Sequence, residues 1–255
     1  MSLKYWQKRI GASVLGLGLL SSGQSLHASD AQPVRMTIER VAHLFSSKSS
    51  IATVKMQITN EDGQRNLSMK IWSSGDKIIV RITGPQDEAG IAILKEGNDI
   101  QYYLPKSNRT VTVPTSMAMN SWMGSDFTID DLVKETFLAR DYSVITSFVG
   151  QRGGIAVYEY TLTPKPDAAV VWGKVVLQIR QADSVPTWQG FYDEDGKLVR
   201  ELTFSDYKTM GGRLIPTRLV MQPADKVGTR TTIEYEDIAF DVPITAATFS
   251  LPNQK

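Results

Sequence analysis

Histidine, cysteine and closely spaced carboxylates are the side chains best able to bind metals or act in catalysis, and this sequence offers few of them. It contains no cysteine and only two histidines, His27 and His43. A zinc site made of His and Cys is therefore excluded once the N-terminal segment is set aside, and the carboxylates lack the regular spacing of a calcium loop. We expect neither a metal nor a cofactor.

A nucleophilic triad of Ser, His and Asp is not indicated either. It would have to use His43, yet the sequence has no G-x-S-x-G turn, and Gly124-Ser125-Asp126 does not resemble a nucleophile elbow. His43 falls on a predicted helix. We interpret it as a residue on the surface of that helix.

Acidic clusters are the remaining candidates for general acid and base catalysis. Each is expected at a helix start, in a hairpin turn or near a strand end, where carboxylates occur for structural reasons. The glycines fall singly at turns and make no phosphate-binding loop. The sequence therefore predicts a protein that is not an enzyme. The clusters are Asp130-Asp131, Asp193-Glu194-Asp195 and Glu236-Asp237.

The segment 116–127 is the most unusual part of the sequence, because large apolar side chains crowd it without a strand or helix period. Methionine is flexible and polarisable, so such clusters suit surfaces that fit variable apolar partners. The segment either packs as ordinary core at the mouth of a sheet or forms a lid that an apolar ligand displaces, and both interpretations can hold together. The candidate ligand-contacting residues are Met117, Met119, Trp122, Met123 and Phe127.

Residues 1–28 have the layout of a secretory signal peptide. A basic start with Lys4, Lys8 and Arg9 precedes an apolar run over residues 10–20, and small or polar residues follow. The run is about half of the roughly 20 residues that span a bilayer, so a permanent anchor is the weaker interpretation. We expect export from the cytoplasm.

Cleavage after Ala28 or after Ala31 would suit a peptidase that requires small residues near the cut. Removal of residues 1–28 takes away three basic side chains and leaves 25 Lys and Arg against 27 Asp and Glu, a balance that does not suggest nucleic acid binding. The lack of cysteine excludes a lipidated N-terminal Cys and disulfides. We expect residues 29–255 to form a single domain, soluble in the periplasm of a Gram-negative cell.

The elements that would position these residues are mostly β-strands. From residue 52 onward the apolar residues show a period of two, and Gly, Pro, Asn and Asp mark the turns between the runs. The expected strands are 52–58, 67–71, 78–82, 92–94, 99–104, 109–113, 142–149, 155–162, 174–181, 187–192, 197–207, 214–222 and 229–235.

Two amphipathic helices are expected beside the strands. The first spans residues 37–45, and the second starts at Thr128, an N-cap residue followed by acidic side chains in the first turn. The fold class is therefore mainly β with few helices (α+β), with the strands stacked as two sheets or curled into a barrel that helices cover. The apolar faces comprise Ile38, Val41, Ala42 and Phe45 in the first helix and Leu132, Val133 and Phe137 in the second.

Motifs spread through the chain resemble the LolA-like family of outer membrane lipoprotein-sorting proteins. The element GSDF followed by DDL is fairly specific, and the similarity covers nearly all of residues 29–255 in order. The matching segments are Tyr102-Tyr103-Leu104-Pro105, Arg109, Trp122-Met123-Gly124-Ser125-Asp126-Phe127, Asp130-Asp131-Leu132, Phe191-Tyr192, Asp195-Gly196-Lys197-Leu198, Phe204-Ser205-Asp206-Tyr207, Ile215-Pro216-Thr217-Arg218 and the stretch from Phe240-Asp241 to Phe249.

This resemblance implies an incomplete, strongly curved antiparallel β-barrel of the LolA/LolB type, covered by helices and a loop. It also implies a soluble periplasmic carrier that shields lipoprotein or lipid acyl chains during transfer towards an outer-membrane acceptor. An inner-membrane transporter of the RND or ABC type is the other partner it suggests. The alternative is a periplasmic accessory subunit that docks such a transporter and carries nothing.

In a carrier of this kind, two further aromatic residues are candidates for the cavity wall. We expect Trp72 and Phe45 to line it beside the lid segment. The face assigned to a strand residue reverses with a shift of one position, so Trp72 depends on the register of its strand.

Overall fold

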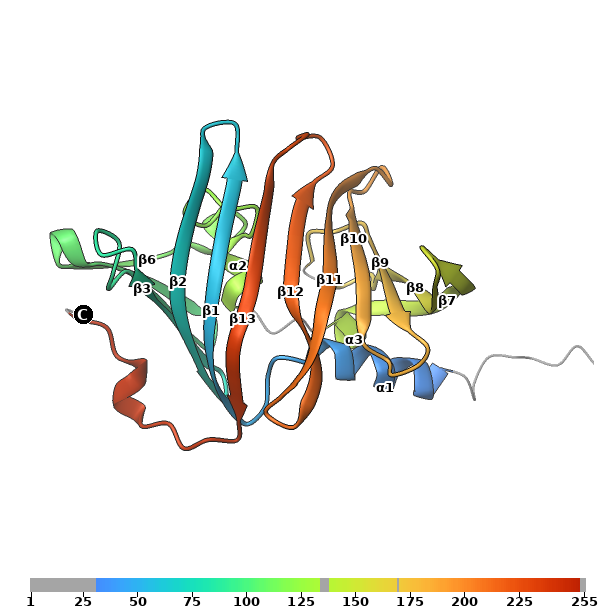
Figure 1. Ribbon diagram of the computed structural model, residues 1–255, viewed down its shortest axis with the longest axis horizontal. Helices are drawn as coiled ribbons and strands as arrows, with labels where there is room; N and C mark the ends of the chain where they lie inside the picture. Colours follow the sequence, from blue (N-terminus) through green and yellow to red (C-terminus); the bar gives the residue numbers. More distant parts are fainter. Residues whose placement is uncertain (1–30, 134–137, 169, 253–255) are drawn as a thin grey trace, which may run out of the picture.

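The computed structural model describes residues 31–133, 138–168 and 170–252, which form one antiparallel sheet of 13 strands with short helices on one side (Figure 1). The strand order is β6-β5-β4-β3-β2-β1-β13-β12-β11-β10-β9-β8-β7. The strands are β1 (Ser49–Asn60), β2 (Gly63–Ser74), β3 (Lys77–Gly84), β4 (Ala92–Glu96), β5 (Asp99–Leu104), β6 (Arg109–Thr112), β7 (Tyr142–Arg152), β8 (Ile155–Pro164), β9 (Lys174–Arg180), β10 (Pro186–Tyr192), β11 (Leu198–Met210), β12 (Arg213–Pro223) and β13 (Arg230–Phe240).

Short helices complete the described part of the chain. They are α1 (Ala31–Ala42), α2 (Ile129–Val133), α3 (Leu138–Asp141) and the 3-10 helices η1 (Pro105–Ser107), η2 (Thr115–Met117) and η3 (Ala246–Phe249). The fold is thus mainly β with few helices, and all 13 predicted strands are present with bounds shifted by a few residues.

The sheet consists of two hairpin series joined by one long-range ladder. Strands β1 to β6 and β7 to β13 pair in chain order, and β1 pairs with β13, where Val54 lies opposite Tyr235 and Met56 opposite Ile233. β6 and β7 are the two edges, so the sheet is not closed. Both ends of the sheet bend back behind its central strands (Figure 1). The predicted incomplete antiparallel barrel is confirmed.

Alternation along the strands determines which face is buried. In β1 the side chains of Ala52, Val54, Met56 and Ile58 are at most 4% exposed, whereas Lys55 points to solvent. Burying such a set on most of the strands makes the concave face the main hydrophobic core. The helices and the connection between β6 and β7 lie on this side.

Helix α1 begins and ends earlier than the sequence pattern indicates. Pro33 is accommodated in its first turn, where the missing N–H has no intrahelical partner anyway. The apolar face is present, since Ile38 is fully buried. After Ala42 the chain continues as a tight turn in which the Leu44 N–H donates to the Val41 carbonyl, so Phe45 follows the helix instead of lying in it.

Helix α2 starts where its capping residues predict. The Asp131 N–H donates to Thr128 Oγ1 at 3.1 Å, and the Thr128 N–H donates to Asp131 Oδ2 at 2.8 Å. This reciprocal pair satisfies two N–H groups that the first turn would otherwise leave free. The predicted continuation to Phe137 lies outside the described residues, and α3 was not predicted.

The convex face is covered in part by the C-terminal segment 241–252. Phe249 and Leu251 pack with Ile79 and Leu94 in a second hydrophobic cluster, and Trp72 contacts this cluster. The placement of Trp72 on the concave face was therefore wrong. In β2 the neighbouring residue Ile71 faces the core, and alternation sends Trp72 to the opposite side.

Among the described residues, no helix is both long and apolar enough to cross a membrane.

Phe249→Ala tests whether the C-terminal segment stabilises the sheet. Phe249 is 7% exposed, so removing its ring should lower the free energy of unfolding by about 3 kcal/mol, measured by denaturant titration. Val227→Ala is the control, because Val227 is 97% exposed and its loss should change little. Equal stability of the two variants would show that the segment only rests on the sheet.

Candidate functional site

An apolar cavity lies on the concave side, between the two hairpin series. Its volume is about 350 Å³, within the range of roughly 300 to 1,000 Å³ that is usual for small-molecule sites. One wall comes from β1 to β3 and the other from β10 to β13. The principal strand residues in these walls are Val54, Met69, Ile71, Ile78, Phe191, Phe204, Leu219, Met221, Ile233 and Tyr235.

Aromatic side chains give the cavity rigid walls. Phe45 stacks on Tyr235 with ring centroids 4.5 Å apart, and Trp172 packs against Phe191 at 5.2 Å. Burial raises the pKa of Tyr235 far above its ordinary value, and burial, followed by the nearby Asp141 charge, raises the pKa of Tyr142 to about 12. Both phenols are therefore neutral at physiological pH, so they add no charge to the cavity.

The segment 113–128 covers this side of the sheet as a compact loop. Ser121 and Thr128 form an isolated β-bridge, and the Trp122 N–H donates to the Phe127 carbonyl at 2.9 Å. Gly124 adopts a φ of 78°, which favours glycine. Ser125 is buried, and its hydroxyl donates to the Phe127 carbonyl at 3.1 Å. The loop therefore has its own internal framework.

Polar contacts tie this loop to the sheet. Thr231 of β13 donates from Oγ1 to Asp126 Oδ2 at 2.7 Å and accepts from the Asp126 N–H at 2.9 Å. Arg65 of β2 donates to the Met123 carbonyl at 2.8 Å and forms an ion pair with Glu88. The loop is thus bound to both hairpin series, across the cavity.

The most buried tie is the ion pair between Arg200 of β11 and Asp131 of α2. Two Arg200 N–H groups reach the two carboxylate oxygens at 2.7 and 2.8 Å, and the arginine side chain is only 7% exposed. The Arg200 guanidinium also lies 4.7 Å from the Trp172 ring and 4.6 Å from the Phe191 ring. Because a buried charge is costly unless paired, this contact makes sheet, helix and cavity wall depend on one another.

The predicted site residues separate into three groups. Phe45, Met119 and Phe127 line the cavity. Trp122 is 2% exposed and belongs to the core beside it, without lining it. Met117 is 47% exposed and lies at the outside of the loop, whereas Met123 is half-buried and packs against the core.

The residues of the family motif also divide. Gly124, Ser125 and Asp126 build the loop, and Asp131 holds it to Arg200. The other three lie at the β5–β6 edge, away from the cavity, and their contacts are structural. Tyr103 donates to Asn108 at 3.2 Å, Pro105 opens η1, and Arg109 is an exposed residue of β6.

Several wall residues were missed by the sequence interpretation. The segment 170–172 contributes Val170, Val171 and Trp172, and the apolar run in which they stand was a usable signal. The role of Arg200 left no such signal, because its partner lies 69 positions away in the chain.

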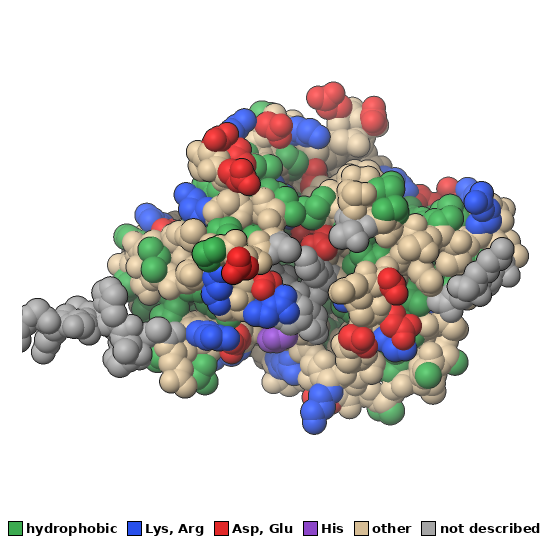
Figure 2. Space-filling view, turned by 180° about the vertical axis from the view of Figure 1, so that it is seen from behind, with side chains coloured by type: hydrophobic (Ala, Val, Ile, Leu, Met, Phe, Trp, Pro, Cys, Tyr) green, Lys and Arg blue, Asp and Glu red, His purple; other side chains and the backbone are tan. Residues whose placement is uncertain are grey.

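The chemistry of the described site is that of a binding cavity. Within the described ranges, no group of three or more His, Cys, Asp or Glu side chains could hold a metal ion. His43 is exposed, and its Nδ1 lies 3.2 Å from Ser46 Oγ. On the helical side, charged side chains of both signs are interspersed with hydrophobic ones (Figure 2). The cavity is suited to binding an apolar group.

Arg200→Met should leave the partly exposed Asp131 carboxylate without its cation and lower the free energy of unfolding by about 1 to 3 kcal/mol. Adding Asp131→Asn should recover much of this loss, because asparagine removes the unpaired charge and can still cap α2. Denaturant unfolding of the two single variants and the double variant measures the coupling. Additive losses would contradict a direct Arg200–Asp131 interaction.

Asp126→Asn should remove a pH-dependent contribution to stability. Burial raises the pKa of Asp126, and the Thr231 hydrogen bond and the Lys226 and Arg200 charges offset this only in part. The folded protein therefore binds this proton more tightly than the unfolded chain. As pH rises from about 4 through the raised pKa, wild type should lose stability relative to the variant, and the difference should then level off. A constant difference across pH would refute the shift.

Comparisons with known proteins place this fold among LolA-like structures. A family model described as an uncharacterized protein matches residues 74–253. No curated protein matches the sequence significantly.

Three solved structures share the fold over 86% of this chain and 97% of their own. A DUF1329 family protein from Desulfovibrio piger is 20% identical with a TM-score of 0.76. A putative outer membrane lipoprotein-sorting protein domain from Vibrio parahaemolyticus is 22% identical with a TM-score of 0.74. A LolA superfamily protein from Nitrosomonas europaea is 22% identical with a TM-score of 0.70. The chain therefore belongs to the family of that model, described as an uncharacterized protein, and it shares the fold of the LolA-like structures.

Proposed function

We propose that this protein is a periplasmic carrier that shields the acyl chains of lipoproteins or lipids on their way towards the outer membrane. The observation that carries the proposal is the apolar cavity between the two hairpin series, with a tied loop over it. Its walls are mostly aliphatic and aromatic, with Asp130, Asp131 and Asp141 on the helical side, and no catalytic constellation accompanies them among the described residues. The protein acts by binding, not by catalysis.

Burial of a hydrocarbon chain supplies enough free energy for this role. Each methylene moved from water into an apolar site is favourable by about 0.8 kcal/mol, so a chain of some sixteen carbons offers on the order of 10 kcal/mol before ordering costs. Release then requires an acceptor of comparable apolarity or a partner that closes the cavity. An inner-membrane transporter of the RND or ABC type as donor and an outer-membrane acceptor fit this scheme.

The loop 113–128 is the proposed lid. Met119 and Phe127 exchange their contacts in the cavity for contacts with the ligand. In the same segment Met117 faces solvent, and Trp122 and Met123 pack against the core. Opening must break the hydrogen bonds from Thr231 to Asp126, from Arg200 to the Asp126 carbonyl and from Arg65 to the Met123 carbonyl. The lid therefore opens only where the ligand or a partner compensates for these contacts.

Export precedes this function in the proposal. Residues 1–28, the proposed signal peptide, lie outside the described residues. Cleavage after Ala28 would leave α1 intact, whereas cleavage after Ala31 would remove its first residue. We favour the first site for this reason.

An accessory subunit that docks a membrane transporter is the second candidate. It is favoured by the edge strand β7, where Ile145 is 63% and Val149 is 59% exposed. An unpaired edge with apolar side chains is suited to pairing with a strand of another protein. In this case the cavity would stay empty.

Native mass spectrometry of the protein purified from a Gram-negative periplasm separates the two candidates. A carrier should retain an acyl compound in stoichiometric amount, identified by extraction and mass analysis. Protein that remains free of ligand, also after incubation with acyl lipids, would reject the carrier in favour of the docking subunit.

Ala42→Trp should block the cavity. Ala42 lines it from the end of α1, and an indole placed there would occupy the space for a chain, with an overpacking cost of about 1 to 3 kcal/mol. Binding of a fluorescent fatty acid should weaken by more than about tenfold. Ala156→Trp is the matched control, because Ala156 is exposed on β8. Unchanged affinity in the folded Ala42 variant would place the ligand elsewhere.

A further inference from the structure

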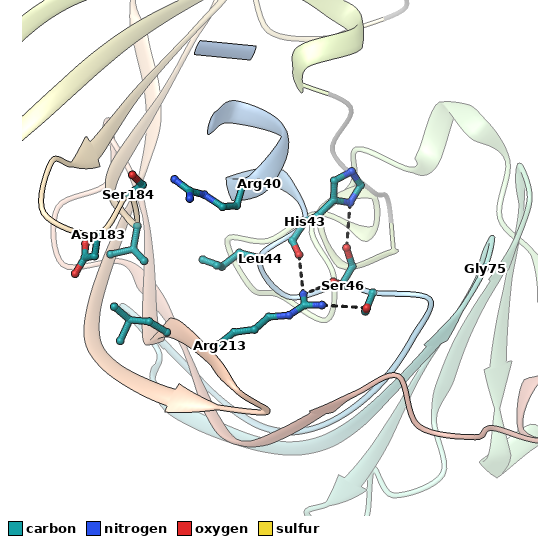
Figure 3. A pocket seen from close by; sticks show the side chains of 11 residues that line it. Arg40, His43, Leu44, Ser46, Gly75, Asp183, Ser184 and Arg213 are labelled. Atoms are coloured by element: carbon teal, nitrogen blue, oxygen red, sulfur yellow. Dashed lines mark hydrogen bonds between the residues drawn. The ribbon is translucent and has the colours of Figure 1, made fainter. Parts of the chain in front are cut away.

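A second pocket opens beside the apolar cavity, at the end of the sheet where α1 terminates (Figure 3). Its volume is about 790 Å³. The turn between β9 and β10 and the turn between β11 and β12 form its other walls. Among its lining residues are Arg40, His43, Ser46, Ser47, Asp183 and Arg213, and we call this space the basic pocket.

Arg213 brings a positive charge that no carboxylate contacts directly. Its guanidinium donates to the Ser46 carbonyl at 2.7 Å, to Ser47 Oγ at 3.0 Å and more weakly to the His43 carbonyl at 3.4 Å. These acceptors are neutral. The nearest acidic link runs through Ser47, which donates to Asp241 Oδ1 at 2.8 Å. Because Arg213 also satisfies the carbonyls at the end of α1, they do not repel an anion in the pocket.

Arg40 adds a second positive charge. It is exposed and forms no ion pair among the described residues. Its side chain points toward Ser184 and Asp183, on the same side as Leu44, whereas the Arg213 guanidinium points toward Ser46 (Figure 3). The carboxylates nearby are already neutralised. Glu39 pairs with Arg35, and Asp183 is held by both nitrogens of the Arg180 fork. The basic pocket thus has two arginines without a direct acidic partner.

The two spaces adjoin. Leu44 and Ser46 line both the basic pocket and the apolar cavity. Leu44 is 9% exposed and stands at the boundary, so one side chain separates a charged compartment from a hydrocarbon compartment. A molecule that fills both must be charged at one end and apolar at the other.

We propose that the basic pocket binds the anionic group, a phosphate or a carboxylate, of an amphiphile whose hydrocarbon chain occupies the apolar cavity. The inference rests on the proposed carrier function and names the class of its cargo. Arg40 and Arg213 supply the N–H donors that such anions accept, and the serine hydroxyls add further donors. The chain enters the cavity past Leu44.

Binding of hexadecyl phosphate and of hexadecanol tests the anion site separately from the carrier function. The two compounds share the hydrocarbon chain, and only hexadecyl phosphate carries an anionic group. The wild-type protein should bind the phosphate at least about tenfold more tightly, as expected when arginine pairs with a phosphate, and added salt should reduce the difference. If hexadecanol binds and hexadecyl phosphate binds no better, the basic pocket is refuted and the carrier stands. If neither binds, both proposals fail.

Arg40→Gln is the decisive variant, because Arg40 has no partner whose loss would disturb the fold. It should remove most of the preference for hexadecyl phosphate and leave the affinity for hexadecanol unchanged. Lys48→Gln is the control, with the same change in net charge, because Lys48 is exposed shortly after the helix and does not line the pocket. If both variants lose the preference for hexadecyl phosphate equally, the effect is one of long-range charge, and the assignment of the anion site to the basic pocket is overturned.

Inorganic phosphate distinguishes a headgroup site from a site for the free anion. At millimolar concentration it should displace little hexadecyl phosphate, because it lacks the chain. Full displacement, or inorganic phosphate binding as tightly as hexadecyl phosphate, would overturn the proposal that the ligand is an amphiphile. The pocket would then be a site for free anions.

Discussion

The ion pair between Arg200 and Asp131 connects the sheet to the part of the chain that covers it. The Arg200 side chain is 7% exposed and the Asp131 side chain 21%, so loss of the aspartate would leave a buried positive charge unpaired. The same Asp131 caps α2 through Thr128, and the same Arg200 lies against two aromatic rings of the cavity wall. The position of the helix, the loop before it and the wall beside it are therefore determined together. We suggest that the pair specifies how the cover docks more than it adds net stability.

A sheet that curves without closing has an apolar concave face that its own side chains do not fill. The β1–β13 ladder joins two hairpin series at an angle, and the space between them becomes the cavity. The loop 113–128 then covers the space through polar ties at Met123 and Asp126 and through apolar contacts of Met119 and Phe127. Such a cover is stable when closed, because opening it breaks hydrogen bonds to the buried side chains of Thr231 and Arg200.

The strands and the fold class could be predicted from the sequence because both depend on local patterns. Alternation placed all 13 strands, and Thr128 marked the start of α2 correctly. Trp72 was assigned to the wrong face, although it alternates with Ile71 and Met69 of the buried set. The indole of Trp72 instead contacts the convex cluster that contains Phe249 and Leu251, which lie far from it in the sequence.

The remaining features depend on contacts between distant residues. In the sequence, Arg200 is one charged residue of a predicted strand, and nothing indicates that the fold places it against Asp131. In the same way, nothing indicates that Thr231 contacts Asp126. The segment 116–127 could be interpreted from the sequence as ordinary core or as a lid over a ligand. Both kinds of residue occur in it, since Trp122 belongs to the core while Met119 and Phe127 line the cavity. The basic pocket combines four segments of the chain, and no local pattern predicts it.

The most direct test of the account is whether an acyl chain reaches the cavity wall. A fatty acid brominated in mid-chain quenches tryptophan fluorescence at short range, and Trp172 lines the cavity whereas Trp188 does not. The account predicts saturable quenching in the wild-type protein that is largely lost in Trp172→Phe and retained in Trp188→Phe. Absence of saturable quenching, or equal quenching in both variants, would contradict it.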